Sequence, residues 1–233
     1  MTNRDIKQRA KEIIKDNLKT ISLVAIIYTA INSAVSNLLT GFRGSILRGL
    51  VSAVVSASSR CFYLRTYNKG RADATDTYEL FTYRDVQSKL FNLMFVYWIV
   101  TCILSIIMRL VAVIPVLNVF IILVCAFISM FMSIIYDLFV LNTEYSAGRY
   151  LKASVKYMGE NFIDYLGFSI YVNIIPCIIA GLIGGVLTVF FGTFGSIVAS
   201  LLTAPIMAYT YIARAGFILK IVPDEWIAGY APF

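Results

Sequence analysis

The sequence from Leu90 to Asn142, LFNLMFVYWIVTCILSIIMRLVAVIPVLNVFIILVCAFISMFMSIIYDLFVLN, decides the fold of this chain. Its only charged side chains are those of Arg109 and Asp137. As one continuous helix it would measure about 80 Å at roughly 1.5 Å per residue, whereas the hydrocarbon core of a bilayer is only about 30 Å thick. We therefore expect it to cross a membrane twice and to turn near Pro115, which removes a backbone donor and restrains the residue before it.

The composition of the whole chain is typical of a membrane protein and argues against a soluble domain. Hydrophobic residues make up 59% and charged residues 14% of its 233 positions, with a mean hydropathy of +0.79. A soluble domain has about 25% charged residues, so this chain has too few charges to cover a surface in water. The net charge of +7 is confined to particular segments, which indicates topology and contact with anionic lipid. No nucleic-acid-binding module is recognisable.

Six apolar segments are predicted to span the membrane, within one integral membrane domain that covers residues 1–233. The spans are 21–39, 49–67, 90–112, 117–142, 162–186 and 190–219. The first is interpreted as a retained helix, because it is longer than the apolar part of a typical signal peptide and follows a segment that mixes acids with bases. The expected fold class is an all-α polytopic membrane protein with amphipathic helices on the cytoplasmic side.

The segment 1–19 is predicted to be one of these cytoplasmic amphipathic helices. Apolar residues recur at helical spacing on one face and lysines on another. The apolar residues are Ile6, Ala10, Ile13, Ile14 and Leu18, and the lysines are Lys7, Lys11 and Lys15. Such a helix either packs on the body of the protein or lies in the lipid interface, where each basic residue contributes roughly 1 kcal/mol near an anionic surface. The two arrangements are compatible.

The distribution of lysine and arginine predicts the orientation. Seventeen of the 20 basic residues fall on the side that holds both termini, and three, Arg43, Arg48 and Arg109, fall on the other. Because cytoplasmic loops carry the excess of positive charge, both termini are predicted to be cytoplasmic.

An internal repeat also follows from the layout. The junctions Asp16-Asn17-Leu18, Ser88-Lys89-Leu90 and Glu160-Asn161-Phe162 are each 72 residues apart, and each leads from a cytoplasmic segment into a predicted hairpin. The first and third are the most alike. This spacing predicts three parallel units, each a helix plus a hairpin, around an axis along the membrane normal.

Two charged residues within the predicted spans form a candidate intramembrane polar pair. Arg60 lies in the cytoplasmic half of the second span and Asp137 about one turn from the cytoplasmic end of the fourth. Charges within a membrane are costly and usually pair, so we expect the two to approach each other. The pair either orients the helices or belongs to an ion or substrate path. Arg109 is expected to extend to the interface.

Small residues near the carboxyl end suggest close helix packing. Gly181 and Gly185 form a small-xxx-small step that permits close contact between helices. Pro176 and Pro205 are expected to add kinks. An alternative is a broken helix that binds a substrate near the membrane midplane, as in some transporters.

No catalytic, cofactor-binding or metal-binding pattern is found in the sequence. Histidine is absent, and the four cysteines, Cys61, Cys102, Cys125 and Cys177, are predicted to be small apolar fillers without disulfides. There is no nucleophile elbow, P-loop or zinc-protease motif. We therefore expect a protein that is not an enzyme and has no cofactor.

Scattered motifs resemble the bacterial multi-pass membrane family named domain of unknown function 975. They are Ile6-Lys7, Ala10, Asn17, Leu80-Phe81, Ile114-Pro115, Ser154, Met158, Asn161 and Phe162. The chain departs from the family at Val116, where glycine is usual, and at Asn142, where an acid is frequent. The resemblance implies a bacterial plasma membrane and six spans, but no activity.

Two functions are compatible with the sequence. The first is a non-enzymatic accessory protein that binds anionic lipid or a membrane-protein partner through its basic cytoplasmic face. The second is a small transporter or channel that uses the polar residues of the second and fourth spans.

Overall fold

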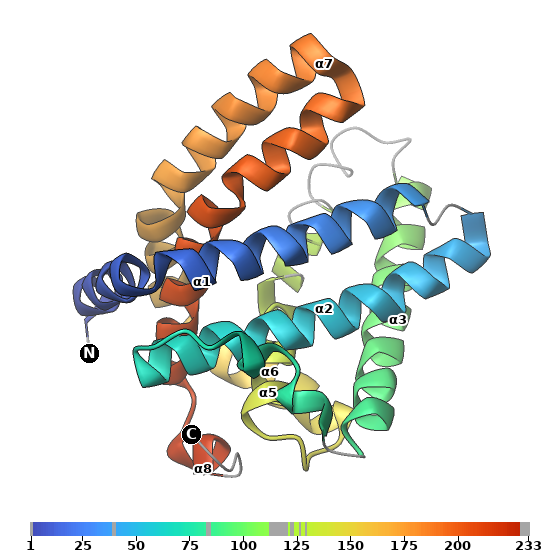
Figure 1. Cartoon of the computed structure of the whole chain (residues 1–233). Coiled ribbons are helices and arrows are strands. Elements are labelled where there is room, and N and C mark those ends of the chain that lie inside the picture. Colours follow the sequence, from blue (N-terminus) through green and yellow to red (C-terminus); the bar gives the residue numbers. More distant parts are fainter. Residues whose placement is uncertain are drawn as a thin grey trace.

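The computed structural model describes residues 2–38, 41–82, 85–111, 121, 124–125, 127–128 and 130–228. It is built of helices (Figure 1), and these described residues contain no strand, so the all-helical prediction is confirmed. The elements are α1 (Asn3–Leu38), α2 (Gly41–Lys69), the 3-10 turns η1 (Ala74–Thr77) and η2 (Glu79–Thr82), α3 (Val86–Val111), α5 (Ile135–Leu141), α6 (Ala147–Glu160), α7 (Phe162–Ile221) and α8 (Asp224–Ala228).

The long helices α1, α2 and α7 form the centre of the molecule. α1 and α2 run side by side in opposite directions, and α7 packs on both of them (Figure 1). α2 also contacts α3 and α5, and α6 and α8 pack against α5. The buried core follows these contacts, with Ile21 of α1, Phe62 of α2 and Phe217 of α7 almost wholly enclosed.

Two helices, α1 and α7, are long and apolar enough to cross a membrane. α7 has no charged residue from Tyr165 to Ala213. Shorter apolar helices occupy 86–100 and 130–141. The predicted turn near Pro115 and the first residues of the predicted fourth span lie outside the described residues. Six separate spans are therefore not established by the length and composition of the described helices, although membrane association is supported.

α7 is a hairpin in space (Figure 1), although its hydrogen bonding is almost continuous. The chain reverses at Gly192, whose φ of 57° and ψ of −137° are outside the helical region and are tolerated by glycine. A Cβ at Gly195 would lie 1.9 Å from the carbonyl oxygen of Leu187, so only glycine permits this close approach of the two arms. The reversal falls a few residues after the predicted boundary at 186–190.

The amino-terminal amphipathic segment and the first predicted span form one helix, bent at Asn17 (φ −121°, ψ 20°). Ile6, Ala10 and Ile13 are buried as expected, whereas Leu18 is 54% exposed. The segment packs on the body of the protein, and Lys7 donates to the carbonyl oxygen of Tyr171 at 3.4 Å.

The first and third predicted repeat junctions share one local geometry. Asn161 (φ −114°, ψ 19°) has nearly the same backbone angles as Asn17. Each amide side chain donates to the carbonyl oxygen four residues earlier, at 2.9 Å in both cases. Asn17 also bonds Gly70 and Ala72. The second junction, Ser88-Lys89-Leu90, lies inside α3 without such a bend, so the likeness extends to two of the three units.

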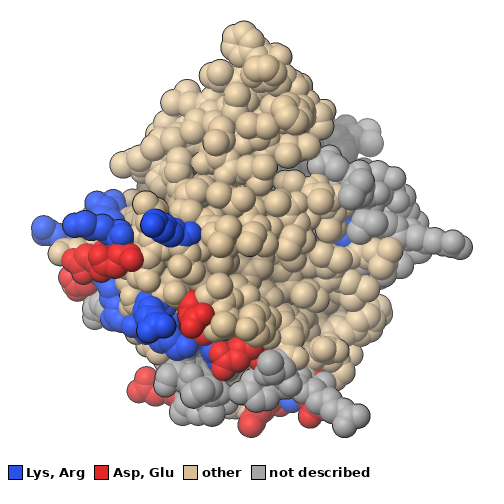
Figure 2. Space-filling model, viewed as in Figure 1, with Lys and Arg blue, Asp and Glu red and all other residues tan. Residues whose placement is uncertain are grey.

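Charged and apolar surfaces are segregated. Figure 2 shows lysine, arginine, aspartate and glutamate side chains along the left and lower edges of this face, and none on the α7 hairpin at the top. The amino terminus and α8 lie on the charged side (Figure 1). The hairpin exposes large apolar side chains, and Val189 is 82% exposed. This segregation matches a membrane protein with one aqueous face.

Candidate functional site

A buried ion network lies where α2, α5 and the second arm of α7 meet. Arg60 Nε is 3.6 Å from Asp137 Oδ1, and Arg214 Nη2 donates to Asp137 Oδ2 at 3.1 Å. Arg214 Nη2 also donates to the carbonyl oxygen of Ser133 at 2.6 Å. The Asp137 side chain is 1% exposed. The structure thus brings Arg60 and Asp137 together and adds Arg214, which we call the Asp137 network.

Each member of the Asp137 network comes from the second helix of a predicted hairpin. Arg60 lies on α2, Asp137 on α5 and Arg214 on the returning arm of α7. The network therefore connects the three units that the 72-residue spacing predicted.

The three charges of the Asp137 network do not cancel. One carboxylate faces two guanidinium groups, which leaves a net charge of +1. In the described part of the chain, Asp137 is the only carboxylate within 4.0 Å of either Arg60 or Arg214. A buried charge without a counter-charge is costly, and both arginines keep part of their side chains exposed, 19% for Arg60 and 17% for Arg214.

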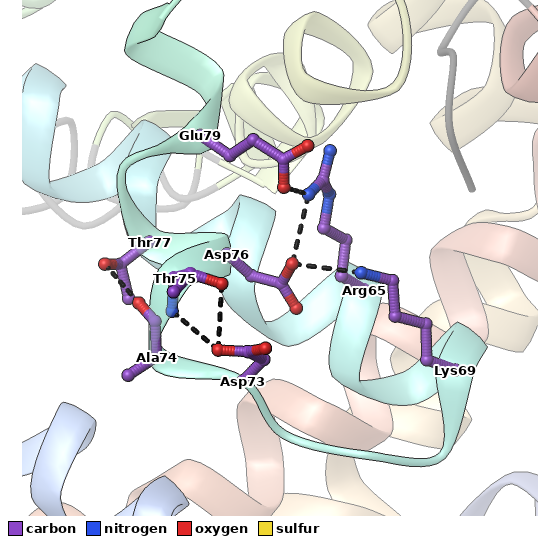
Figure 3. Close-up of polar contacts among 8 residues, drawn as sticks. All are labelled: Arg65, Lys69, Asp73, Ala74, Thr75, Asp76, Thr77 and Glu79. Atoms are coloured by element: carbon purple, nitrogen blue, oxygen red, sulfur yellow. Dashed lines mark hydrogen bonds and ion pairs between the residues drawn. The ribbon is translucent and has the colours of Figure 1, made fainter.

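A second ion cluster shows how the same chain balances buried charge. At the end of α2, Arg65 Nη1 donates to Asp76 Oδ1 at 3.0 Å and also bonds Glu79, while Lys69 Nζ donates to Asp76 at 3.0 Å (Figure 3). Two cations meet two anions, and Arg65 and Asp76 are almost fully buried. This neutral cluster holds η1 and η2 against α2 and has a structural role.

Asp76 and Glu79 have the spacing of a capping box, but Asp76 does not cap η1. Asp73 is the cap: its Oδ1 accepts from the backbone N–H of Thr75 at 2.9 Å (Figure 3). That hydrogen bond holds the pKa of Asp73 below its usual range. Asp76 is drawn instead to Arg65, because a buried guanidinium requires a carboxylate.

A polar cavity of about 320 Å³ opens beside Arg60, between α1, α2 and the returning arm of α7. Hydroxyl and amide groups from all three helices line it. The polar lining residues are Tyr28, Thr29, Asn32, Ser56, Ser59, Arg60, Tyr63, Ser200, Thr203 and Tyr211. Of the serines on α2, Ser56 and Ser59 therefore face this cavity.

A smaller cavity of about 210 Å³ lies beside Arg214. Met207 and Tyr211 line both cavities and stand between them. The ring of Tyr211 stacks on that of Tyr63 at 5.3 Å, and the Arg60 guanidinium lies 5.7 Å from its centroid. Each cavity thus has one arginine of the Asp137 network in its wall.

The other sequence candidates are placed differently. A Cβ built at Gly181 or Gly185 meets nothing within 4 Å, so the packing expected of this pair is not made with any described residue, because the α7 hairpin extends beyond the other helices (Figure 1). The side chain of Arg109 lies outside the described residues. Cys61 and Cys125 are buried, while Cys177 is exposed.

Sequence reasoning missed Arg214 and Tyr211. The count of basic residues includes Arg214, with Lys220, in the cytoplasmic flank, although the long uncharged stretch of α7 precedes it. Arg214 lies about two turns before the end of α7, a depth similar to that of Arg60 in the second predicted span. This depth was the available signal that Arg214 belongs to the interior.

No metal site is formed by the described residues, which contain no group of three or more histidine, cysteine, aspartate or glutamate side chains. Comparisons with protein-family models, curated proteins and solved structures found no match. The resemblance to domain of unknown function 975 therefore stays a prediction.

Proposed function

We propose that this chain is a bacterial plasma-membrane protein with six spans and cytoplasmic termini that binds a small solute in the Arg60 cavity and transports it, without a catalytic step. The carrying observation is the polar cavity next to a network with excess positive charge, inside an otherwise apolar helix bundle. Intramembrane ionisable groups facing a cavity are characteristic of substrate and ion paths.

The placement of the cavity supports this proposal. In the proposed topology Asn32 and Ser200 lie nearer the outer end of their helices than Arg60 does. Asn32 is exposed and Ser200 half-buried, and the proposed path for the solute runs from this end of the cavity toward Arg60.

A flux assay tests the proposal. Protein in liposomes is challenged with acidic, basic and neutral solutes, using solid-supported membrane currents for ions and light scattering of shrinking vesicles for neutral solutes. We expect flux of at least one class that Arg60→Gln abolishes. Lys19→Gln, which removes an exposed lysine of α1, is the matched control and keeps full flux. Absence of flux for all classes would overturn the transport proposal.

A second candidate is an accessory protein that binds anionic lipid or a membrane-protein partner through its charged face. The segregation of charge in Figure 2 favours it. Lys11 and Lys15 are exposed on α1, although Lys7 is held against Tyr171. We expect the purified protein to retain phosphatidylglycerol, and Lys11→Glu with Lys15→Glu to lower the retained amount. Equal retention by this variant would contradict the lipid-binding role.

A further inference from the structure

The Arg60 cavity holds a positive charge that the side chains around it leave unbalanced. Arg214 already donates a hydrogen bond to Asp137, whereas Arg60 makes only the longer contact of 3.6 Å. The carboxylate is therefore paired mainly with Arg214. Arg60 is thus the less closely paired of the two guanidinium groups, and its side chain is 19% exposed and lines the cavity.

Arg60 also has donors to spare. Within the described chain its guanidinium has one ion-pair contact and one ring contact, and no hydrogen bond is found for it. A guanidinium offers five N–H donors in a plane that matches a carboxylate or a phosphate group. An anion in the cavity would both accept hydrogen bonds from these donors and balance the excess positive charge.

Three hydroxyl groups of the cavity wall bear on the rest of the ligand. Ser59, Ser200 and Thr203 each donate to a backbone carbonyl of their own helix, at 2.9 Å in every case. Their protons are therefore used, and their oxygens remain as acceptors. A ligand that meets these oxygens must supply hydrogen-bond donors of its own.

The size of the cavity limits the ligand to a small one. Its volume of about 320 Å³ lies at the lower end of the roughly 300–1,000 Å³ found for small-molecule sites. This excludes a large amphiphile lying wholly inside, but admits a short-chain acid or a headgroup.

We propose that the Arg60 cavity binds a small organic anion that carries hydroxyl or amino donors, such as a hydroxy acid or the phosphate ester of a polyol, with its negative group on Arg60. This inference rests on the proposed solute-binding function and names the ligand class. The same chemistry is present in a free solute and in the headgroup of phosphatidylglycerol, and the test distinguishes the two sources.

Protection of an engineered cysteine measures binding without requiring transport. Thr203→Cys places a thiol in the cavity wall, and Ser56→Cys does so from α2 as a second reporter. The full-length protein in phosphatidylcholine vesicles is treated with a small maleimide, and labelling at that position is followed by peptide mass spectrometry. The probes, at equal ionic strength, are lactate, glycerol 3-phosphate, propionate and glycerol.

We expect lactate or glycerol 3-phosphate to slow labelling at least fivefold, propionate to protect less and glycerol not at all. Arg60→Gln should abolish protection, while Lys19→Gln retains it. Protection in phosphatidylglycerol vesicles without added solute would identify the headgroup as the source, and protection by added solute in phosphatidylcholine vesicles would identify a free anion.

Three results would overturn the inference. If glycerol protects as well as the anions, the cavity does not recognise charge, although the solute-binding proposal stands. If the thiols react but no probe protects either reporter, the assigned ligand class is wrong. If neither reporter can be labelled, the cavity is closed to solutes and the proposed function itself fails.

Discussion

Removing the single carboxylate of the Asp137 network should be the most damaging conservative change in the polar interior. Asp137→Asn leaves Arg60 and Arg214 facing each other with a net charge of +2. Removing one partner of a buried ion pair costs about 3–5 kcal/mol. Because asparagine keeps the shape and can still accept from Arg214, we expect a loss of about 3 kcal/mol, at the lower end of that range.

The structure also ranks the two arginines. Arg214→Gln removes the 3.1 Å hydrogen bond to Asp137 and the 2.6 Å bond to Ser133. Hydrogen bonds that involve a charged group contribute about 1.5–3 kcal/mol, so we expect a loss in that range. Arg60→Gln removes only a 3.6 Å contact and leaves Asp137 and Arg214 as a neutral pair, so its cost should be the smallest of the three.

Unfolding by sodium dodecyl sulfate in mixed micelles measures these differences, with fluorescence of the buried Trp226 as one probe and circular dichroism as another. Asp164→Asn is the control, since Asp164 is 63% exposed and pairs with Lys220 at 3.9 Å; exposed pairs contribute about 0–1 kcal/mol. The assigned pairing is wrong if Asp137→Asn costs no more than this control, or if Arg60→Gln costs as much as Asp137→Asn.

Three further predictions use the same assay or hydrogen exchange. Asn17→Ala removes three hydrogen bonds and Asn161→Ala one, so at about 1 kcal/mol each the first should lower unfolding stability roughly three times as much; equal losses would contradict the assigned contacts. Gly195→Ala must displace a backbone carbonyl and should cost about 1–3 kcal/mol, whereas Gly185→Ala meets open space and should stabilise by about 0.5–1 kcal/mol; a loss at Gly185 would indicate packing against another chain. The lowered pKa of Asp73 means that its cap stabilises η1 fully above the ordinary value of 3.8 and loses this effect as the pH falls through the lower folded value. Protection of the capped amide, corrected for intrinsic exchange, should therefore fall on acidification, and Asp73→Ala should remove that pH dependence.

The helical fold and part of the polar interior could be predicted from the sequence, because they depend on strong local signals. A long apolar run has few alternatives to membrane helices, and charges within such runs seek partners. These two rules were enough to anticipate that Arg60 and Asp137 approach each other.

The missed features depend on tertiary structure. Arg214 lies near a helix end, where a shift of one turn decides whether a charge is part of the aqueous flank or of the interior. The sequence has several glycines near Gly192 and does not show at which of them the chain reverses. The answer depends on how the two arms pack, including the close approach of Leu187 to Gly195. Asp76 fits a local capping pattern, but it pairs with Arg65 instead. A buried guanidinium without a carboxylate would cost more than the lost cap.

The uncharged tip of the α7 hairpin has a consequence for biogenesis. In the proposed topology the segment around Gly192 must be carried through the lipid to the far side, and no charged group has to be dehydrated on the way. Both arms can therefore enter the bilayer together as a preformed hairpin. Arg214 lies at the base of the hairpin, so its hydrogen bond to Asp137 forms only when insertion is complete.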